Sequence, residues 1–151
     1  MTLEKLFLSI ALVQRAGPAG TRCLLKADGE PLGFVQGPRL GRESFRETAI
    51  RETGWQLNLD PRSEFLVSSL ALLSMEYVGV IPGDPVQRHI AVAFYPVKVY
   101  RQQVLDRLDS DPAICWVSMA EICAGRTNEN RVIDPRVVAW INQWEVIRPW
   151  Q

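Results

Sequence analysis

Residues 37–55, with the sequence GPRLGRESFRETAIRETGW, constrain the fold of this chain more than any other stretch. Glycine stands at the start, and residues 44–53 contain neither glycine nor proline. Within them Phe45 and Ala49 recur at helical spacing, which predicts a helix of about three turns. Gly54 is predicted to end this helix, because a left-handed residue after the last turn is least costly without a Cβ atom.

The charged residues of this stretch have a spacing that resembles the Nudix box. Five residues separate Gly37 from Glu43, and seven more separate Glu43 from the pair Arg51-Glu52. The Nudix pattern reads Gly, five residues, Glu, seven residues, Arg-Glu, an aliphatic residue, any residue, Glu-Glu, any residue, Gly and an aliphatic residue. The first half matches at every fixed position. In the second half the Glu-Glu pair is absent, because Glu52 is followed directly by the sequence TGW.

The resemblance implies a divalent-metal site on the predicted helix. In the family pattern three glutamates stand at positions i, i+3 and i+4, so their carboxylates share one helix face and can hold Mg²⁺ or Mn²⁺ beside a pyrophosphate. Glu52 alone remains of these three, and aligning Arg51-Glu52 with the Glu-Glu pair still leaves one carboxylate. The implied site therefore has Glu43 and Glu52 as metal ligands, Glu52 as a catalytic carboxylate, and Arg51 as the residue that orients it through an ion pair.

The relative placement of the glutamates depends on where the helix begins. Glu43 and Glu47 are i, i+4 neighbours, whereas Glu52 lies nine residues beyond Glu43, about half a turn around an ideal helix. Glu43 and Glu52 would face apart unless Glu43 lies in the loop before the helix, as the resemblance implies.

The stretch is mildly basic. Its arginines outnumber its glutamates: Arg39, Arg42, Arg46 and Arg51 against Glu43, Glu47 and Glu52. This balance suits an anionic ligand better than a bare divalent cation. Gly37, Arg39 and Trp55 are therefore candidate contacts for a nucleotide-like small molecule.

The whole chain reads as one domain, residues 1–151, with a formal net charge of zero. That charge gives no indication of nucleic acid or an anionic membrane as a partner, and no apolar stretch has the length of a membrane-spanning helix. The apolar N-terminal run, 6–13, is interpreted as a strand rather than a signal peptide. Three cysteines without metal-ligand spacing are expected to be reduced, small buried hydrophobes, as in a cytoplasmic protein: Cys23, Cys115 and Cys123.

Turn signals predict strands at 6–14, 21–26 and 33–36, which lead into the box helix in the order that the resemblance implies. Residues 61–76 leave two alternatives open: a helix with an apolar face, or strands including 65–67 and 77–81, as the family layout favours. A loop at 82–85 and a strand at 89–100 follow. In that strand Pro96 indicates an edge or a bulge.

In the last third of the chain, the sequence predicts a short helix at 102–108 and contains a second stretch that resembles the family. Residues 113–122 are similar to the Trp-Val-Ser-x-x-Glu-Leu segment found late in Nudix domains, where a strand passes into a helix capped by Ser118 with Glu121 three residues on. Asp134 and Pro135 begin a final helix with an apolar stripe: Val137, Val138, Ile141 and Trp144. The predicted fold class is α/β, a Nudix-like α/β/α sandwich with a mixed β-sheet.

Other residues fit either a structural or a functional role. His89 is the only histidine, and a partly buried, hydrogen-bonded side chain is the commoner outcome than a general base. A polar loop at 126–131 could contact phosphates or a base, and more often such a loop is solvated. Trp55, Tyr77 and Phe94 could stack on a nucleobase, although these residue types usually pack in the core.

The resemblance implies hydrolysis of a nucleoside diphosphate linked to another group, with a divalent metal that polarises a phosphoryl oxygen and generates hydroxide. Three hypotheses follow for this chain. It is a Nudix-like binding module whose hydrolysis is weakened or lost, or an active hydrolase that recruits a carboxylate from outside the box, such as Glu76 or Glu129. Alternatively, it is a structural subunit whose C-terminal helix docks a partner, with Trp144 and Trp150 equally suited to a homodimer interface.

Overall fold

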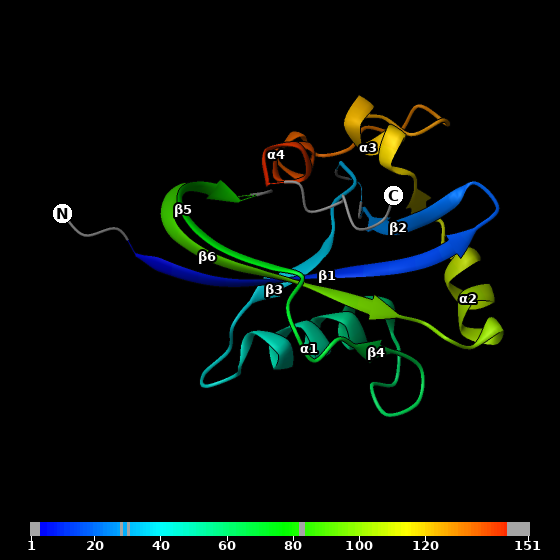
Figure 1. Ribbon diagram of the computed structural model, residues 1–151, viewed down its shortest axis with the longest axis horizontal. Helices are drawn as coiled ribbons and strands as arrows, with labels where there is room; N and C mark the ends of the chain where they lie inside the picture. The colour runs from blue at the N-terminus through cyan, green and yellow to red at the C-terminus, as the bar shows by residue number, and fades with distance from the viewer. Residues whose placement is uncertain (1–3, 28, 30, 82–83, 145–151) are drawn as a thin grey trace.

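The computed structural model describes residues 4–27, 29, 31–81 and 84–144. These residues form three layers, with α1 and α2 below a central sheet and α3 and α4 above it (Figure 1). The helices are α1 Phe45–Leu57, α2 Gln102–Asp109, α3 Met119–Ala124 and α4 Pro135–Trp144. The predicted α/β/α sandwich is therefore confirmed.

Seven strands form one mixed sheet within the described residues. Their bounds are β1 Lys5–Gly17, β2 Gly20–Lys26, β3 Val35–Pro38, β4 Leu66–Val67, β5 Leu73–Ile81, β6 Asp84–Lys98 and β7 Ile114–Val117. β1 runs parallel to β6, and the other pairs are antiparallel. The first part of β1 pairs with β3, with Ser9 opposite Gly37, and its last part pairs with β2. This register places β3, and the loop that follows it, beside α1.

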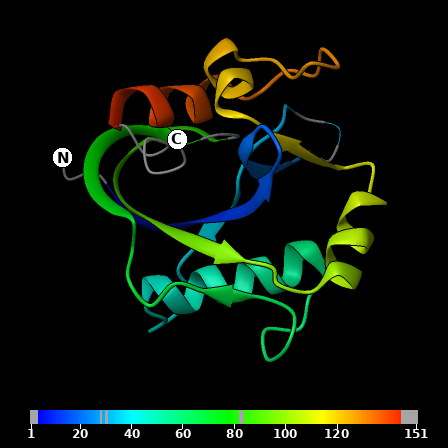
Figure 2. The same cartoon turned by 45° about the vertical axis from the view of Figure 1, so that its right-hand side comes forward.

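Each face of the sheet has its own hydrophobic core, because successive side chains of a strand point to opposite faces. Ile10 and Leu12 of β1 belong to the core under α3 and α4, together with Trp140. Ala11 and Val13 belong to the core over α1 and α2, together with Ala49. Seen turned by 45°, the two helical layers enclose the sheet (Figure 2). The box helix α1 is therefore fixed against the sheet by buried apolar contacts.

Helix α1 continues past the position at which the sequence predicts its end. Gly54 lies inside the helix, which ends at Leu57, and Asn58 takes the left-handed conformation with φ of 54°. Asparagine tolerates this conformation better than most residues with a side chain. A Cβ atom on Gly54 would lie 3.2 Å from the carbonyl oxygen of Leu59, so glycine allows the chain after the helix to pack closely against it. The prediction that Gly54 ends the helix is wrong.

Residues 61–76 contain strands and no helix, so the alternative favoured by the family layout is confirmed. Leu70, on the expected apolar helix face, is 77% exposed. The segment is held by long-range hydrogen bonds instead, since Arg46 of α1 donates to the carbonyl oxygens of Val67 (2.9 Å) and Ser68 (3.0 Å). Tertiary contacts of this kind leave no trace in helical periodicity, which explains why the helix was a plausible alternative.

Strand β6 starts at Asp84, earlier than predicted, and contains Pro96 in its interior rather than at an edge. On one side of β6, β1 pairs with it as far as Lys98. On the other side, β5 pairs with β6 up to Phe94, and β4 pairs with Val97 and Lys98. Proline therefore lies in the gap between two partner strands, where its missing N–H donor costs least. The register shift occurs in β5, between Gly79 and Ile81. Of the loop predicted at 82–85, residues 82–83 lie outside the described residues.

The predicted elements of the last third are present. Ser118 and Glu121 form the expected capping box at the start of α3, and α4 begins at Pro135. In α4, Trp140 is 2% exposed and its indole Nε1–H donates to the Tyr77 hydroxyl at 2.8 Å, which ties α4 to β5. Trp140 is thus a core residue and not part of an exposed docking face. Trp150 and the side chain of Trp144 lie outside the described residues.

The cysteines differ in burial, and all three are free thiols. Cys23 is buried as expected, and burial raises its pKa well above the usual value. Cys115 is partly buried, whereas Cys123 is exposed, so the expectation of a buried hydrophobe is wrong for Cys123. Among the described residues, no helix combines the length and apolarity needed to cross a membrane.

Candidate functional site

The site is built around the beginning of α1. Ser44 is the N-cap, its hydroxyl accepts the N–H of Glu47, and the Glu47 carboxylate accepts the N–H of Ser44. This capping box fixes the first helical residue at Phe45. Glu43 consequently lies in the preceding loop, as the resemblance implies, and its side chain reaches the same side of the helix as Arg51.

Arg51 connects the two candidate carboxylates. Its Nε donates to Glu43 Oε2 at 2.8 Å and its Nη2 to Glu43 Oε1 at 3.0 Å. Its Nη1 donates to Glu52 Oε2 at 3.2 Å, and Nη2 also donates to the carbonyl oxygen of Pro38 at 2.9 Å. The arrangement is a carboxylate–guanidinium–carboxylate cluster in which the fork of Arg51 meets Glu43 in bidentate fashion.

Glu43 accepts further hydrogen bonds that hold it as the carboxylate anion. Its Oε1 accepts the backbone N–H of Leu40 at 2.9 Å and the hydroxyl of Thr48 at 3.1 Å. The hydrogen bond from Arg51, followed by that from Leu40, lowers the pKa of Glu43 from 4.5 to about 2. Glu43 is therefore an ion-paired anion throughout the neutral range, and its lone pairs are largely committed to donors of the chain itself.

The lowered pKa of Glu43 links this cluster to acid stability. A carboxylate with a lower pKa in the folded state stabilises the fold above about pH 4.5, and the contribution is lost as the pH falls through about 2. We expect Glu43→Gln to flatten the fall in unfolding free energy across this window, measured by urea unfolding followed by circular dichroism. Glu129→Gln, an exposed carboxylate elsewhere, serves as the control and should keep the wild-type slope. Equal slopes in wild type and Glu43→Gln would contradict the role of the pair.

Glu52 lies against the backbone of β3. A Cβ atom built on Gly37 would lie 2.3 Å from Glu52 Cδ, closer than any real contact. Gly37 is therefore a strand residue whose missing side chain leaves room for the Glu52 carboxylate. This close approach keeps Glu52 largely buried, with its side chain 12% exposed.

Arg39 and Trp55 flank the cluster. The Arg39 guanidinium carbon lies 3.8 Å from the centroid of the Phe7 ring, and its backbone N–H donates to Phe7. The Arg51 guanidinium lies 4.9 Å from the Trp55 ring, and Trp55 is 69% exposed. A large aromatic surface in solvent next to a cationic group is the arrangement by which proteins stack planar ligands.

The other aromatic candidates are not available for stacking. Phe94 is fully buried and packs edge-on against Trp140, with ring centroids 5.9 Å apart. The hydroxyl of Tyr77 bonds Trp140, and burial raises the pKa of Tyr77. Of the three aromatic residues considered from the sequence, Trp55 alone keeps a large exposed face.

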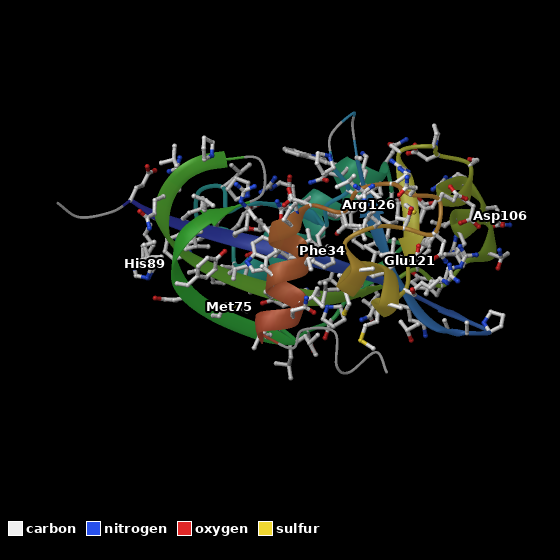
Figure 3. The ribbon with its side chains drawn as sticks, turned by 90° about the horizontal axis from the view of Figure 1, so that it is seen from above. Phe34, Met75, His89, Asp106, Glu121 and Arg126 are labelled. Atoms are coloured by element: carbon white, nitrogen blue, oxygen red, sulfur yellow. The ribbon has the colours of Figure 1, made fainter. Side chains whose placement is uncertain are left out.

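His89 and the two carboxylates considered for recruitment have surroundings of their own. His89 Nε2 lies 3.1 Å from Glu76 Oε2, and Glu76 also pairs with Lys5 at 3.3 Å. His89 lies at the opposite end of the molecule from Asp106, as Figure 3 shows from above. Glu129 lines a cavity beside β7 together with Glu121. His89 therefore has the partly exposed, hydrogen-bonded role that is common for histidine.

The polar loop at 126–131 is closed by its own hydrogen bonds. Arg126 Nη1 donates to Asn130 Oδ1 at 3.2 Å, and the N–H of Asn128 donates to Glu121 Oε2 at 2.8 Å. Asn130 has a positive φ of 66°. The loop therefore reads as a compact connection between α3 and α4.

The donor set does not fit a divalent metal. Over the described ranges, no group of three or more His, Cys, Asp or Glu side chains is close enough to hold a metal ion. Glu43 and Glu52 are both bonded to Arg51, whose positive charge occupies the space between them. The residues that would ligate Mg²⁺ or Mn²⁺ by resemblance are thus engaged with a guanidinium in place of a cation from solution.

Three contacts of the site were not singled out from the sequence. Thr48 is fully buried and bonds Glu43, the N–H of Leu40 holds the same carboxylate, and the carbonyl oxygen of Pro38 accepts from Arg51. Backbone contacts have no sequence signal. The Ser-x-x-Glu pattern from Ser44 is a capping-box signature, and it could have fixed the helix start and hence the position of Glu43.

Solved structures share this fold across almost the whole chain, whereas no protein-family model and no curated protein matches the sequence. An Ap4A hydrolase from C. elegans has a TM-score of 0.61 at 12% identity, with 98% of this chain and 95% of that chain covered. The Nudix hydrolase RenU from M. smegmatis has a TM-score of 0.57 at 14% identity, covering 94% and 86%. NrtR from Shewanella oneidensis, solved with a 27mer DNA, has a TM-score of 0.60 at 13% identity, covering 91% of this chain and 59% of that chain.

The fold that this chain shares with these structures is the Nudix fold. At these identities the likeness concerns the fold alone. The protein is a Nudix-like α/β protein whose box helix carries a Glu43–Arg51–Glu52 cluster.

Proposed function

We propose that the protein binds a nucleoside diphosphate-linked small molecule at the α1 site and that its metal-dependent pyrophosphate hydrolysis is weakened or lost. The observation that carries this proposal is Arg51, which bonds both remaining carboxylates of the box. A divalent ion coordinated by these carboxylates would first have to displace the Arg51 guanidinium. That displacement would cost the charge-assisted hydrogen bonds of a partly buried pair.

The charges around the cluster favour an anionic ligand. Arg51 neutralises one of the two carboxylates, and Arg39 and Arg42 add two positive charges in the loop before the helix. The Arg42 side chain is exposed and has no ion pair with the described residues. Two arginines near the helix N-terminus are well placed to bind phosphate oxygens. Trp55, with its exposed face, is the candidate platform for the base of the same ligand.

Two other functions have less support. An active hydrolase needs further carboxylates beside Glu52, and Glu76, one of the two candidates from the sequence, is paired with Lys5 and His89. A structural subunit that docks through α4 would need exposed tryptophan surface, and Trp140, the one tryptophan of α4 whose side chain the structure describes, is buried. Binding without efficient turnover is the function that the described contacts support best.

A ligand panel tests the proposal. ADP-ribose, a dinucleoside polyphosphate and a nucleoside triphosphate are titrated by calorimetry, and phosphate release is followed with Mg²⁺ or Mn²⁺. We expect at least one ligand to bind saturably. We expect no metal-dependent phosphate release of the kind that Glu52→Gln would abolish. Arg39→Gln should weaken binding by about ten-fold, since a charge-assisted hydrogen bond is worth about 1.5–3 kcal/mol. Arg62→Gln, which removes an exposed arginine elsewhere, is the matched control.

Each result of the panel decides between functions. Metal-dependent turnover lost in Glu52→Gln would replace the proposal with an active hydrolase. Absence of binding to every ligand would move the assignment to the structural role. Binding that Arg39→Gln leaves unchanged would remove the α1 site as the place of binding.

A further inference from the structure

Two arginines face each other across the hairpin that joins β1 and β2. Arg15 is directly opposite Arg22 in the antiparallel register. Like charges in directly opposite positions destabilise a strand pair. The hairpin lies at the far end of β1 from the box loop, with α2 below it (Figure 1). A cross-strand pair of this kind calls for negative charge to compensate it.

Among the described residues, Arg15 has a direct ion pair and Arg22 has none. Its Nη1 donates to Asp109 Oδ1 at 2.7 Å, and the same oxygen accepts the indole Nε1–H of Trp116 at 2.9 Å. The Arg15 guanidinium also lies 5.2 Å from the Trp116 ring centroid. Within the described part of the chain, the side chain of Arg22 forms no hydrogen bond and no ion pair.

Two of the nearby carboxylates, Glu121 and Asp111, accept hydrogen bonds from backbone N–H groups. Glu121 exerts a longer-range attraction on Arg22, but its oxygens accept the N–H groups of Ser118 at 3.0 Å and Asn128 at 2.8 Å. Asp111 Oδ1 accepts the N–H of Ala113 at 2.9 Å. The Arg22 guanidinium therefore has unused donors.

A pocket of about 520 Å³ lies directly over the pair. It is lined by Arg15, Arg22, Trp116 and hairpin residues 16–19, with no carboxylate in the lining. A neighbouring cavity of about 600 Å³ shares Arg22 and Trp116 with it, but there Arg22 and Arg131 face four acidic side chains: Asp109, Asp111, Glu121 and Glu129. The charge of the two cavities thus differs, and an anion belongs in the first.

We propose that the pocket between Arg15 and Arg22 binds a phosphate or pyrophosphate group. Guanidinium groups on either side supply forked donors that match phosphate oxygens, and the indole of Trp116 forms the apolar wall. The pocket is distinct from the α1 site, because Arg15 lies six residues along β1 from Ser9, the partner of Gly37, a span of about 20 Å. It is a second anion site, independent of the proposed function.

Inorganic pyrophosphate is the probe for this site, titrated into the full chain by calorimetry at low ionic strength. We expect Arg22→Gln to weaken binding at least ten-fold, because it removes the unpaired donors, while Arg62→Gln changes the affinity less than two-fold. Arg22→Lys should retain part of the affinity. This variant checks that a substitution at position 22 does not itself disrupt the fold. Equal affinity in wild type and Arg22→Gln, or no binding by wild type, would overturn the proposal.

The place of binding is read from the indole N–H of Trp116 in a proton–nitrogen correlation spectrum, assigned with Trp116→Phe. We expect this signal to shift as pyrophosphate saturates the protein. Loss of pyrophosphate binding in Arg39→Gln but not in Arg22→Gln would assign the anion to the α1 site and refute the second site. Repeating the titration with ADP separates the sources of the phosphate: tighter binding than pyrophosphate, lost in Trp116→Leu, identifies a nucleotide, and equal binding identifies the anion alone.

Discussion

Replacement of Arg51 by methionine is expected to lower the free energy of unfolding by about 2–3 kcal/mol at pH 7. The substitution leaves Glu43 and Glu52 without their shared cation, and removing one partner of a fully buried pair typically costs roughly 3–5 kcal/mol. The cost here is smaller because the side chains of Arg51 and Glu43 are 15% and 21% exposed, so water screens part of the charge. Methionine keeps most of the aliphatic volume, so the loss reports the charge and hydrogen bonds.

The pH dependence distinguishes this electrostatic effect from a packing defect. In the variant Glu43 loses the guanidinium that lowers its pKa and can be neutralised by a proton, whereas wild-type Glu43, with its pKa lowered to about 2, stays ionised and paired. The destabilisation measured by urea unfolding should therefore shrink as the pH falls from about 5 towards 3. Arg62→Met, on an exposed arginine outside the site, should change stability by less than about 0.5 kcal/mol. A loss that is the same at both pH values would indicate packing and would weaken the case for the ion cluster.

The box could be predicted from sequence because its signals are local. The run of residues without glycine or proline predicts α1, and the resemblance implies an ion pair of Arg51 with Glu52, which the structure contains beside the pair with Glu43. The capping boxes at Ser44 and Ser118 are likewise local patterns of two residues. When the two partners of a contact lie within one helical turn of each other, or within a known motif, their spacing in the sequence predicts the contact.

The features that sequence reasoning missed depend on partners that are distant in the chain. Gly54 looks like a helix end, but the turn after it is stabilised by packing, and Asn58 supplies the left-handed residue. The register of β1 with β2 sets Arg15 opposite Arg22, and one residue more in the turn would shift the pairing. The contact between Gly37 and Glu52 likewise follows from how α1 packs on β3.

The same distinction explains the two alternatives at residues 61–76. Periodicity favoured a helix as readily as strands, and the decision came from pairing with β6 and from the bonds of Arg46 to the carbonyl oxygens of Val67 and Ser68. Cys123 was expected in the core because of its residue type, and it is exposed because α3 ends at Ala124 and its outer face is open. Residue type and hydrophobic periodicity do not decide between helix and strand here, or between a buried and an exposed cysteine; the tertiary structure does.

Substitution of Gly37 by alanine is expected to displace the Glu52 carboxylate and to cost about 1–3 kcal/mol in unfolding free energy. The new methyl group would lie 2.3 Å from Glu52 Cδ and 2.6 Å from its Cγ, so the side chain has to leave its place. The hydrogen bond from Arg51 Nη1 to Glu52 Oε2 is lost with it. In a strand without such a contact, alanine is more favourable than glycine, so a loss of stability cannot come from backbone propensity.

Gly33 provides the matched control, because a Cβ atom there would have no neighbour within 4 Å. We expect Gly33→Ala to be neutral or slightly stabilising in the same urea unfolding experiment. The double variant Gly37→Ala, Glu52→Ala should be no less stable than Glu52→Ala alone, because the atoms that clash are absent. If Gly37→Ala still destabilises in the absence of the Glu52 side chain, the glycine is required for the strand itself, and the close packing of Glu52 on β3 is not what fixes its position in the cluster.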